Sequence, residues 1–245
     1  MLPVSVVIRT LNEAPQLRRL IMALQSQSLR PTELIVVDNE STDSTAQVAE
    51  VWATKVVTIP FEEFSYPRSL NAGMGIASCP VVVSLPAHAV PMRRDWLESA
   101  VRHFDRTAVA GVYSAVRPNV GAGLFERMMY NWTWCTKRKG SPYDIKEAAL
   151  GTFSATCHAA RRSTWMEHPF DEQYGMGGED VEWAAWAMTQ GKAIVYDHRF
   201  TVRHSHGLNA WQLYKQIKEW QAMLEPQPFD RRNIRYRRRD ETPST

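Results

Sequence analysis

The chain has 245 residues, of which 44% are apolar and 22% charged, a composition typical of a folded protein with a sizeable core. Its formal net charge is +3, but six arginines lie between positions 231 and 239, so the rest of the chain is close to neutral and lacks the basic stripe of a nucleic-acid binder. The three cysteines are widely spaced, which excludes a disulfide framework and a CxxC metal site. With no signal-peptide pattern and no membrane-spanning apolar run, we expect a cytoplasmic protein.

Two hydrophobic periods alternate through the first half of the chain. Continuous apolar runs at 4–8, 34–37, 56–59 and 81–85 predict strands that are buried on both faces. Helical spacing or helix-capping residues predict helices over 17–24, after 41–44, over 67–77 and over 96–104. This alternation implies right-handed βαβ units and a mostly parallel sheet.

The second half is less regular. We predict strands at 109–116, 153–159, 193–196 and 200–202, and helices at 180–189 and 211–223. Residues 118–150 mix Gly, Asn, Lys and aromatic residues, and we expect a mobile or acceptor-facing segment there. Because neither an internal repeat nor a long linker is present, we predict a single domain over 1–225, followed by an Arg-rich tail at 226–245.

Polar residues follow the predicted strands at the edge where open α/β sheets bind ligands. Asp38 ends an apolar strand and could accept hydrogen bonds from a ribose or a base, although a turn with a helix cap is the alternative. Arg68 lies near a helix start, where a guanidinium can bind phosphate, and Asn71 could contact a base or ribose. The alternative for Arg68 is an ordinary solvated surface residue.

Glu179 and Asp180 follow two glycines at a predicted helix start. Adjacent buried acids raise each other's pKa, which suits a general base. The alternative is a carboxylate pair that is favoured only by the helix dipole.

Three histidines are candidates for metal ligation. His88 follows the fourth strand, and His204 and His206 share one face if their segment is extended. Without cysteine ligands, Mg²⁺ or Mn²⁺ completed by diphosphate oxygens fits better than zinc. A histidine packed at a strand end is the alternative for His88.

Together these segments resemble the family 2 inverting glycosyltransferases of the GT-A fold, over roughly residues 3–220. The resemblance implies a Rossmann-like α/β sandwich with a mostly parallel central sheet, in which 1–117 is the nucleotide-binding half and 118–225 the acceptor and catalytic half. It rests on the opening Val4-Ser5-Val6-Val7-Ile8-Arg9-Thr10-Leu11-Asn12-Glu13, on Val36-Val37-Asp38-Asn39-Glu40-Ser41-Thr42-Asp43-Ser44-Thr45, on Arg68-Ser69-Leu70-Asn71-Ala72-Gly73, on Gly178-Glu179-Asp180 and on Val202-Arg203-His204-Ser205-His206.

The resemblance also implies roles for single residues. Asp180, with Glu179 beside it, would activate the acceptor hydroxyl for a single displacement with inversion. His88, and His204 rather than His206, would hold a divalent cation, Mn²⁺ or Mg²⁺. The residues implied in nucleotide binding are Thr10, Asn12, Glu13, Asp38, Arg68, Asn71 and Ala87.

One segment departs from the family pattern. The usual metal motif Asp-x-Asp is replaced by Pro86-Ala87-His88, within a Leu-x-Ala-His-Ala-x-Pro pattern that resembles a subgroup of these enzymes. A neutral imidazole binds Mg²⁺ or Mn²⁺ less strongly than a carboxylate does, so metal dependence is open. A catalytically inactive nucleotide-sugar binder is therefore one alternative. A nucleotidyltransferase is another, but the segment after the first strand lacks a Gly-rich phosphate loop.

The expected partners are a nucleotide-diphosphate sugar donor and a saccharide or lipid-linked saccharide acceptor. The arginines at 231–239 suggest peripheral contact with an anionic membrane at its inner face, and a solvated tail is the alternative. We expect no nucleic-acid partner.

Overall fold

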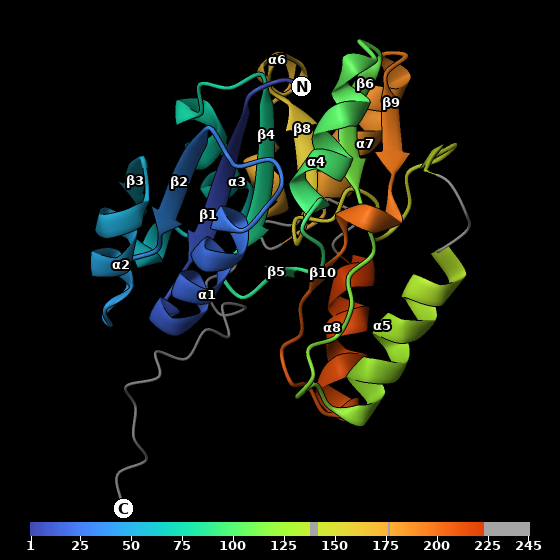
Figure 1. Ribbon diagram of the computed structural model, residues 1–245. Helices are drawn as coiled ribbons and strands as arrows, with labels where there is room; N and C mark the ends of the chain where they lie inside the picture. The colour runs from blue at the N-terminus through green and yellow to red at the C-terminus, as the bar shows by residue number, and fades with distance from the viewer. Residues whose placement is uncertain (138–141, 176, 223–245) are drawn as a thin grey trace, which may run out of the picture.

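An eight-stranded sheet in the order β3-β2-β1-β4-β8-β6-β9-β7 forms the centre of the computed structural model (Figure 1). The structure describes residues 1–137, 142–175 and 177–222. The first four strands in this order are parallel to one another. Every residue of the strand from Val4 to Thr10 is buried, as its continuous apolar run predicts. These strands are β1 (Val4–Thr10), β2 (Glu33–Asp38), β3 (Lys55–Thr58) and β4 (Val81–Pro86).

The other half of the sheet has mixed strand directions. β8 (His158–Arg161) runs antiparallel between β4 and β6 (Val109–Tyr113), and β9 (Ala193–Tyr196) lies parallel to β6. β7 (Tyr143–Asp144) is an antiparallel edge strand, while β5 (Val90–Pro91) and β10 (Val202–Arg203) form a separate ribbon. Both halves share one continuous sheet, so the expected single α/β domain with a mostly parallel sheet is confirmed.

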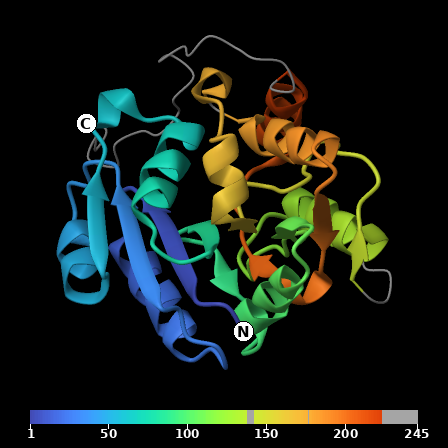
Figure 2. The same cartoon turned by 90° about the horizontal axis from the view of Figure 1, so that it is seen from above.

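Helices cover both faces of the sheet (Figure 2). One buried cluster joins the sheet to α1 (Ala14–Gln25), α2 (Thr45–Trp52) and α4 (Trp96–Val101). The other joins it to α3 (Tyr66–Ile76), α6 (Arg162–Glu167) and α7 (Glu179–Thr189). In the described part of the chain, four 3-10 helices complete the layers: η1 (Phe61–Glu63), η2 (Arg102–Asp105), η3 (Glu172–Tyr174) and η4 (His198–Phe200).

Two further helices, α5 (Leu124–Lys137) and α8 (Ala210–Ala222), pack against each other below the sheet, beside β10 (Figure 1). No helix is expected from the sequence within 118–150, yet this segment forms α5, while its acceptor-facing role stays a prediction. Its aromatic residues obscure the helical period in the sequence, and the helix packs against α8, which lies far along the chain. Within the described ranges, no helix combines the length and apolar character needed to cross a membrane.

Three strand predictions need correction. The strand expected at 153–159 begins only at His158, because Gly151 and Phe153 have positive φ values of 79° and 57°, which an extended strand does not accept. The strand expected at 200–202 is displaced because the Asp197 carboxylate accepts the Arg199 N–H and starts η4. The strand expected at 109–116 ends at Tyr113.

A glycine in α3 sets how closely this helix approaches the sheet. A Cβ on Gly73 would lie 2.3 Å from Cγ1 of Val7, a stiff branched side chain in β1. We expect Gly73→Ala to lower the free energy of unfolding by about 1–3 kcal/mol. In the same helix, a Cβ on Gly75 would meet nothing closer than 3.9 Å, so Gly75→Ala should be neutral or stabilising by up to ~1 kcal/mol. Urea titration of both variants checks this, and equal losses of stability would contradict it.

Candidate functional site

A cavity of about 490 Å³ lies where the carboxyl ends of β1 and β4 face the α5–α8 pair. Met129 and Tyr130 of α5 and Gln216 and Ile217 of α8 form one wall. The start of α7 and the segments after β4 and β10 form the others. Seven of the residues singled out from the sequence line this one cavity: Thr10, Glu13, His88, Glu179, Asp180, His204 and His206.

Asp180 lies at the N-terminal end of α7 and faces the cavity. The preceding Gly178 has a φ of 106°, a left-handed conformation that favours glycine and lets the chain turn sharply into the helix. The Asp180 carboxylate accepts the backbone N–H groups of Ala155, at 2.9 Å, and Val181, at 2.8 Å. Burial raises the pKa of Asp180, while these hydrogen bonds and Arg9 oppose the rise. Among the described residues it forms no ion pair, so the carboxylate remains available as a proton acceptor.

Glu179 differs from its neighbour although the two are adjacent in sequence. Its side chain is fully buried, and neither carboxyl oxygen has a hydrogen-bond partner in the described part of the chain. Burial, and next the charge of Asp180, raise the pKa of Glu179. The two acids are thus set apart by their surroundings, with Glu179 favouring the protonated form and Asp180 accepting hydrogen bonds as an anion.

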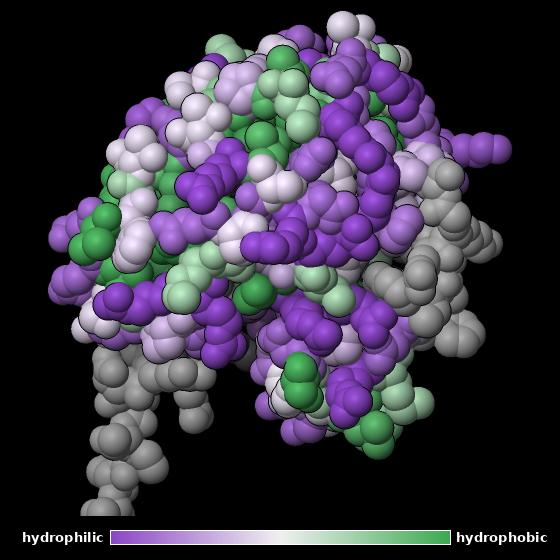
Figure 3. Space-filling model, in the orientation of Figure 1, coloured by the Kyte–Doolittle hydropathy of each residue, from purple (hydrophilic) through white to green (hydrophobic). Residues whose placement is uncertain are grey.

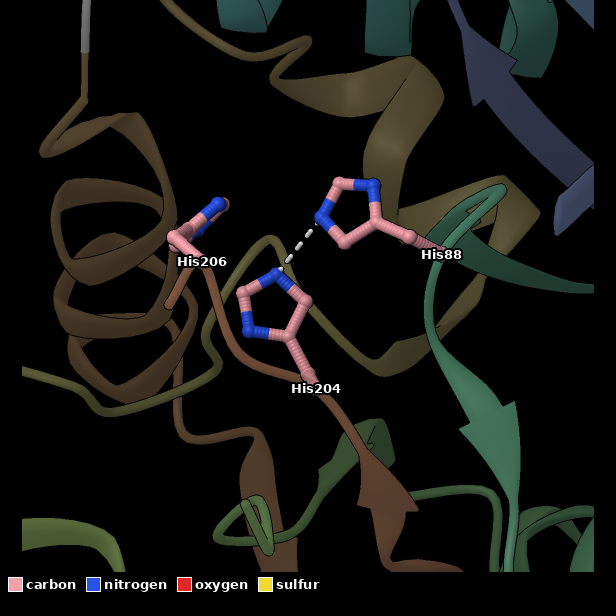
Figure 4. Close-up of side chains that lie close together, drawn as sticks. All are labelled: His88, His204 and His206. Atoms are coloured by element: carbon pink, nitrogen blue, oxygen red, sulfur yellow. Dashed lines mark hydrogen bonds between the residues drawn. The ribbon is translucent and has the colours of Figure 1, made fainter. Parts of the chain in front are cut away.

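His88, His204 and His206 converge from two distant segments of the chain (Figure 4). Nε2 of His88 lies 2.9 Å from Nε2 of His204, and Nδ1 of His88 lies 2.6 Å from a carboxylate oxygen of Glu13. Burial, together with the neighbouring rings, lowers the pKa values of His204 and His206. Neutral imidazoles are metal ligands, so this donor set fits the divalent cation that the sequence suggests, with His206 as an additional candidate ligand.

Asp38 and Asn12 do not line the cavity; their side chains form hydrogen bonds with the loop at 41–43. The Asp38 carboxylate accepts hydrogen bonds from the backbone N–H and the hydroxyl of Ser41, at 3.0 and 2.5 Å. Burial raises the pKa of Asp38. Oδ1 of Asn12, a residue with a φ of 53°, accepts the backbone N–H groups of Thr42 and Asp43. The nucleotide contacts expected for Asp38 and Asn12 stay predictions.

Arg68 and Asn71 of α3 also lie outside the residues that line the cavity. The half-exposed Arg68 guanidinium pairs with Glu63 and lies 3.9 Å from Glu172. Asn71 donates to the Phe170 carbonyl and accepts the Phe170 N–H, which fixes its amide inside the fold. Ala87 is buried, and its N–H donates to the Arg9 carbonyl. Their roles in nucleotide binding likewise remain predictions.

Arg9 is a cavity residue that the sequence analysis did not select. It is 7% exposed, donates to the Ala155 carbonyl at 2.8 Å and lies over the Tyr66 ring. Its Nε has no hydrogen-bond partner among the described residues. A buried cation at the end of a strand suits a bound anion. The sequence feature that could have indicated this residue is its position directly after the apolar run Val6-Val7-Ile8, where a charged side chain is unusual.

The family assignment follows from a match between residues 5–167 and the profile of glycosyl transferase family 2, which covers more than half of the chain. The chain belongs to this family. The O-antigen chain rhamnosyltransferase WbaN of Salmonella anatum is 28% identical over 79% of the chain, and RfbN of Salmonella typhimurium is 24% identical over 83%. The chain spans 62% and 66% of the length of these two relatives.

Solved structures place this family 2 chain in the GT-A fold expected from its sequence. The mannosyltransferase PcManGT of Pyrobaculum calidifontis, in complex with GDP-Man and Mn²⁺, superposes with a TM-score of 0.64 at 20% identity, covering 93% of this chain and 66% of that one. Glucosyl-3-phosphoglycerate synthase of Mycobacterium tuberculosis gives 0.65 at 18% identity, covering 91% of this chain and 78% of that one. At these identities the likeness shows the fold alone.

Glu126 ties the cavity wall of this family 2 chain to the loop that carries His206. Its buried carboxylate accepts the backbone N–H groups of His206, Gly207 and Leu208, at 2.7, 2.9 and 3.2 Å. A glutamine has one oxygen fewer and adds a donor that faces these N–H groups. We expect Glu126→Gln to lower the free energy of unfolding by about 1–3 kcal/mol. The exposed Glu147→Gln is the control, and denaturant titrations that coincide for both variants would refute this.

Proposed function

We propose that this chain transfers a sugar from a nucleotide-diphosphate donor to a hydroxyl acceptor, with inversion at the anomeric carbon. The observation that carries the proposal is the Asp180 carboxylate, which faces the cavity and forms no ion pair among the described residues. Its raised pKa suits a base that must accept a proton near neutral pH. Membership of family 2 supports the reaction class.

In the proposed reaction, Asp180 takes the proton of the acceptor hydroxyl as its oxygen attacks the sugar carbon opposite the departing diphosphate. Glu179, held protonated by burial, keeps a second negative charge away from the attacking oxygen. Arg9 supplies positive charge to the leaving group from the floor of the cavity. His88 and His204 would hold a divalent ion, Mn²⁺ or Mg²⁺, which neutralises diphosphate charge when bound.

The nucleotide contacts belong to the same proposal. Thr10 and Glu13 line the cavity, and the buried Thr10 hydroxyl has no partner among the described residues, which supports a contact with the donor. The remaining proposed contacts, which lie around this edge of the sheet or on α3, are Asn12, Asp38, Arg68, Asn71 and Ala87.

The donor is proposed to carry a hexose or a deoxyhexose, and the product to be a polysaccharide or glycoconjugate. The similarity to two O-antigen chain rhamnosyltransferases supports a deoxyhexose as the first choice. Incubating the chain with UDP-, dTDP- and GDP-sugars and candidate acceptors, followed by NMR of the new anomeric centre, tests donor and stereochemistry together. A product that retains the donor configuration would overturn inversion.

A nucleotide-sugar binder without catalytic activity is the second candidate, because Pro86-Ala87-His88 replaces the carboxylates of the family's metal motif. We propose instead that this segment marks a subgroup of active enzymes. Calorimetry separates the two candidates: donor binding without turnover, with Mn²⁺ and with chelator, would favour the binder.

Peripheral contact with an anionic membrane at its cytoplasmic face is a further part of the proposal. The arginines at 231–239 lie outside the described residues, and in the sequence they follow the last residue of α8 by nine positions. The first turn of α5 exposes Leu124 by 68%, and the first turn of α8 exposes Trp211 by 62%. Arg127 is exposed on α5, and Lys215 lies over the Trp211 ring. Figure 3 shows apolar surface among polar surface on the lower lobe of the molecule. Apolar side chains among basic ones suit an anionic lipid surface.

We expect deletion of 231–245 to weaken binding to vesicles that contain anionic lipid, and Leu124→Glu to weaken it further. Co-sedimentation with vesicles checks this, and Met22→Glu, on the exposed side of α1, is the matched control. Equal binding to neutral and anionic vesicles would rule out the electrostatic contact.

A further inference from the structure

The ion site of this chain differs in its donor atoms from a carboxylate site. The three histidines each offer one ring nitrogen, and these nitrogens lie within 4.8 Å of one another. His88 follows β4, whereas His204 and His206 follow β10, and Figure 4 shows the three rings turned toward a common point. The acid closest to this cluster in the hydrogen-bond network, Glu13, is already bonded to His88.

The spacing of two of these nitrogens is that of ligands to a single ion. Imidazole nitrogens that bind one ion at about 2.1 Å and at a right angle to each other lie about 3 Å apart. The Nε2 atoms of His88 and His204 are 2.9 Å apart. In the absence of an ion, a hydrogen bond between the two rings accounts for this separation, and a bound ion would take the place of the proton between the two nitrogens.

Glu13 sets which nitrogen of His88 faces the cluster. Its carboxylate lies 2.6 Å from Nδ1 of His88 and accepts the proton of that nitrogen. In the neutral ring that donates from Nδ1, the lone pair is on Nε2, which faces His204. A carboxylate in this position fixes the tautomer of a metal-binding histidine and makes the ring a better electron donor.

His206 completes the set from the open side of the cavity. Its ring meets the His204 ring edge-on, with centroids 4.6 Å apart, and lies 5.3 Å from the His88 ring. Glu126 holds the backbone of His206 in place through the N–H contact at 2.7 Å. The ring is therefore positioned by the fold, although its side chain is exposed to the cavity.

We propose that His88, His204 and His206 together bind the divalent ion, that Glu13 is the positioning residue for His88, and that this site selects a transition-metal ion over Mg²⁺. Mg²⁺ prefers oxygen ligands in an octahedron, whereas imidazole nitrogen favours Co²⁺, Ni²⁺ and Zn²⁺ over Mn²⁺. The role of the ion in sugar transfer rests on the proposed function. Ion binding itself is measured without any sugar donor.

The test is calorimetric titration of the chelator-treated full chain with Mg²⁺, Mn²⁺, Co²⁺ and Zn²⁺ at neutral pH. We expect affinity to rise from Mn²⁺ to Co²⁺ and Zn²⁺, with Mg²⁺ at least ~100-fold weaker than Co²⁺. His206→Gln and Glu13→Gln should each lower Co²⁺ affinity by about 10–100-fold. His198→Gln, in η4 and outside the cavity lining, is the matched control and should bind as the unchanged chain does.

The visible absorption of bound Co²⁺ separates ligation from a general structural effect. Loss of the His206 nitrogen should change the Co²⁺ bands, and Glu13→Gln should shift them without removing a ligand. Melting curves of the ion-free variants check that each folds. Equal Mg²⁺ and Co²⁺ affinities would overturn the selectivity, an unchanged His206→Gln would overturn the third ligand, and an unchanged Glu13→Gln would overturn the positioning role. Ion binding as expected with no sugar transfer would instead defeat only the proposed function.

Discussion

Replacement of Asp180 by Asn is expected to reduce kcat for sugar transfer by about 10²–10⁴-fold, the usual contribution of a general base. The amide keeps the size of the side chain and can still accept one of the two backbone N–H groups from Ala155 and Val181. It cannot take the proton of the acceptor hydroxyl. Donor binding, measured by calorimetry, should change little, because the loss falls on the transition state.

The pH dependence of the rate gives a second test of Asp180 as the general base. Asp180 must be ionised to act as a base, and burial raises its pKa above the ordinary 3.8. The rate should therefore fall as pH drops through this raised pKa, and the residual rate of Asp180→Asn should lack that fall. Asp105→Asn, which changes an exposed carboxylate at the end of η2, is the control. Unchanged turnover in Asp180→Asn would remove this residue from the mechanism.

Replacement of Glu179 by Gln is expected to stabilise the protein at mildly alkaline pH, by about 1–3 kcal/mol. The folded state holds a proton on Glu179 that the unfolded chain releases above the ordinary pKa of 4.5. The contribution of Glu179 to the free energy of unfolding is thus full at acid pH and is lost as pH rises from 4.5 toward the raised pKa. A glutamine never ionises, so the difference between variant and parent should grow with pH.

Denaturant titrations at several pH values measure that difference, with the exposed Glu50→Gln as control. The same variant should leave the pKa seen in the rate profile nearly unchanged, because Glu179 is already uncharged at the pH where Asp180 titrates. A stability difference that is constant across pH would show that Glu179 is ionised in the folded protein.

Local patterns predicted the first half of the chain well, because its strands are apolar runs and its helices have a clear buried stripe, such as Leu17, Leu20 and Leu24 in α1. The errors fall where distant parts of the chain decide local structure. α5 packs on α8, and Phe153 takes a left-handed conformation while its ring stacks on Trp183. No local pattern contains those contacts.

The residues of the candidate site also fall into those that local motifs predicted and those that depend on distant contacts. Asp180, His88 and His204 were named from short motifs, and the fold gathers all three around one cavity. Arg9 was missed because a lone arginine in a strand is recognised only when its burial is known. The link between Glu13 and His88 joins residues 75 positions apart, and only the parallel pairing of β1 with β4 brings their loops together.

The carboxylate of Glu126 joins the first turn of α5 to the loop that carries His206. Because it fastens the His206 loop to the first turn of α5, any tilt of that helix carries the third imidazole with it. Tyr130, one turn further along α5, lines the pocket where an acceptor would enter. If His206 binds the proposed ion, we expect an acceptor that displaces this tyrosine also to move the His206 ring, because Glu126 joins α5 to the His206 loop.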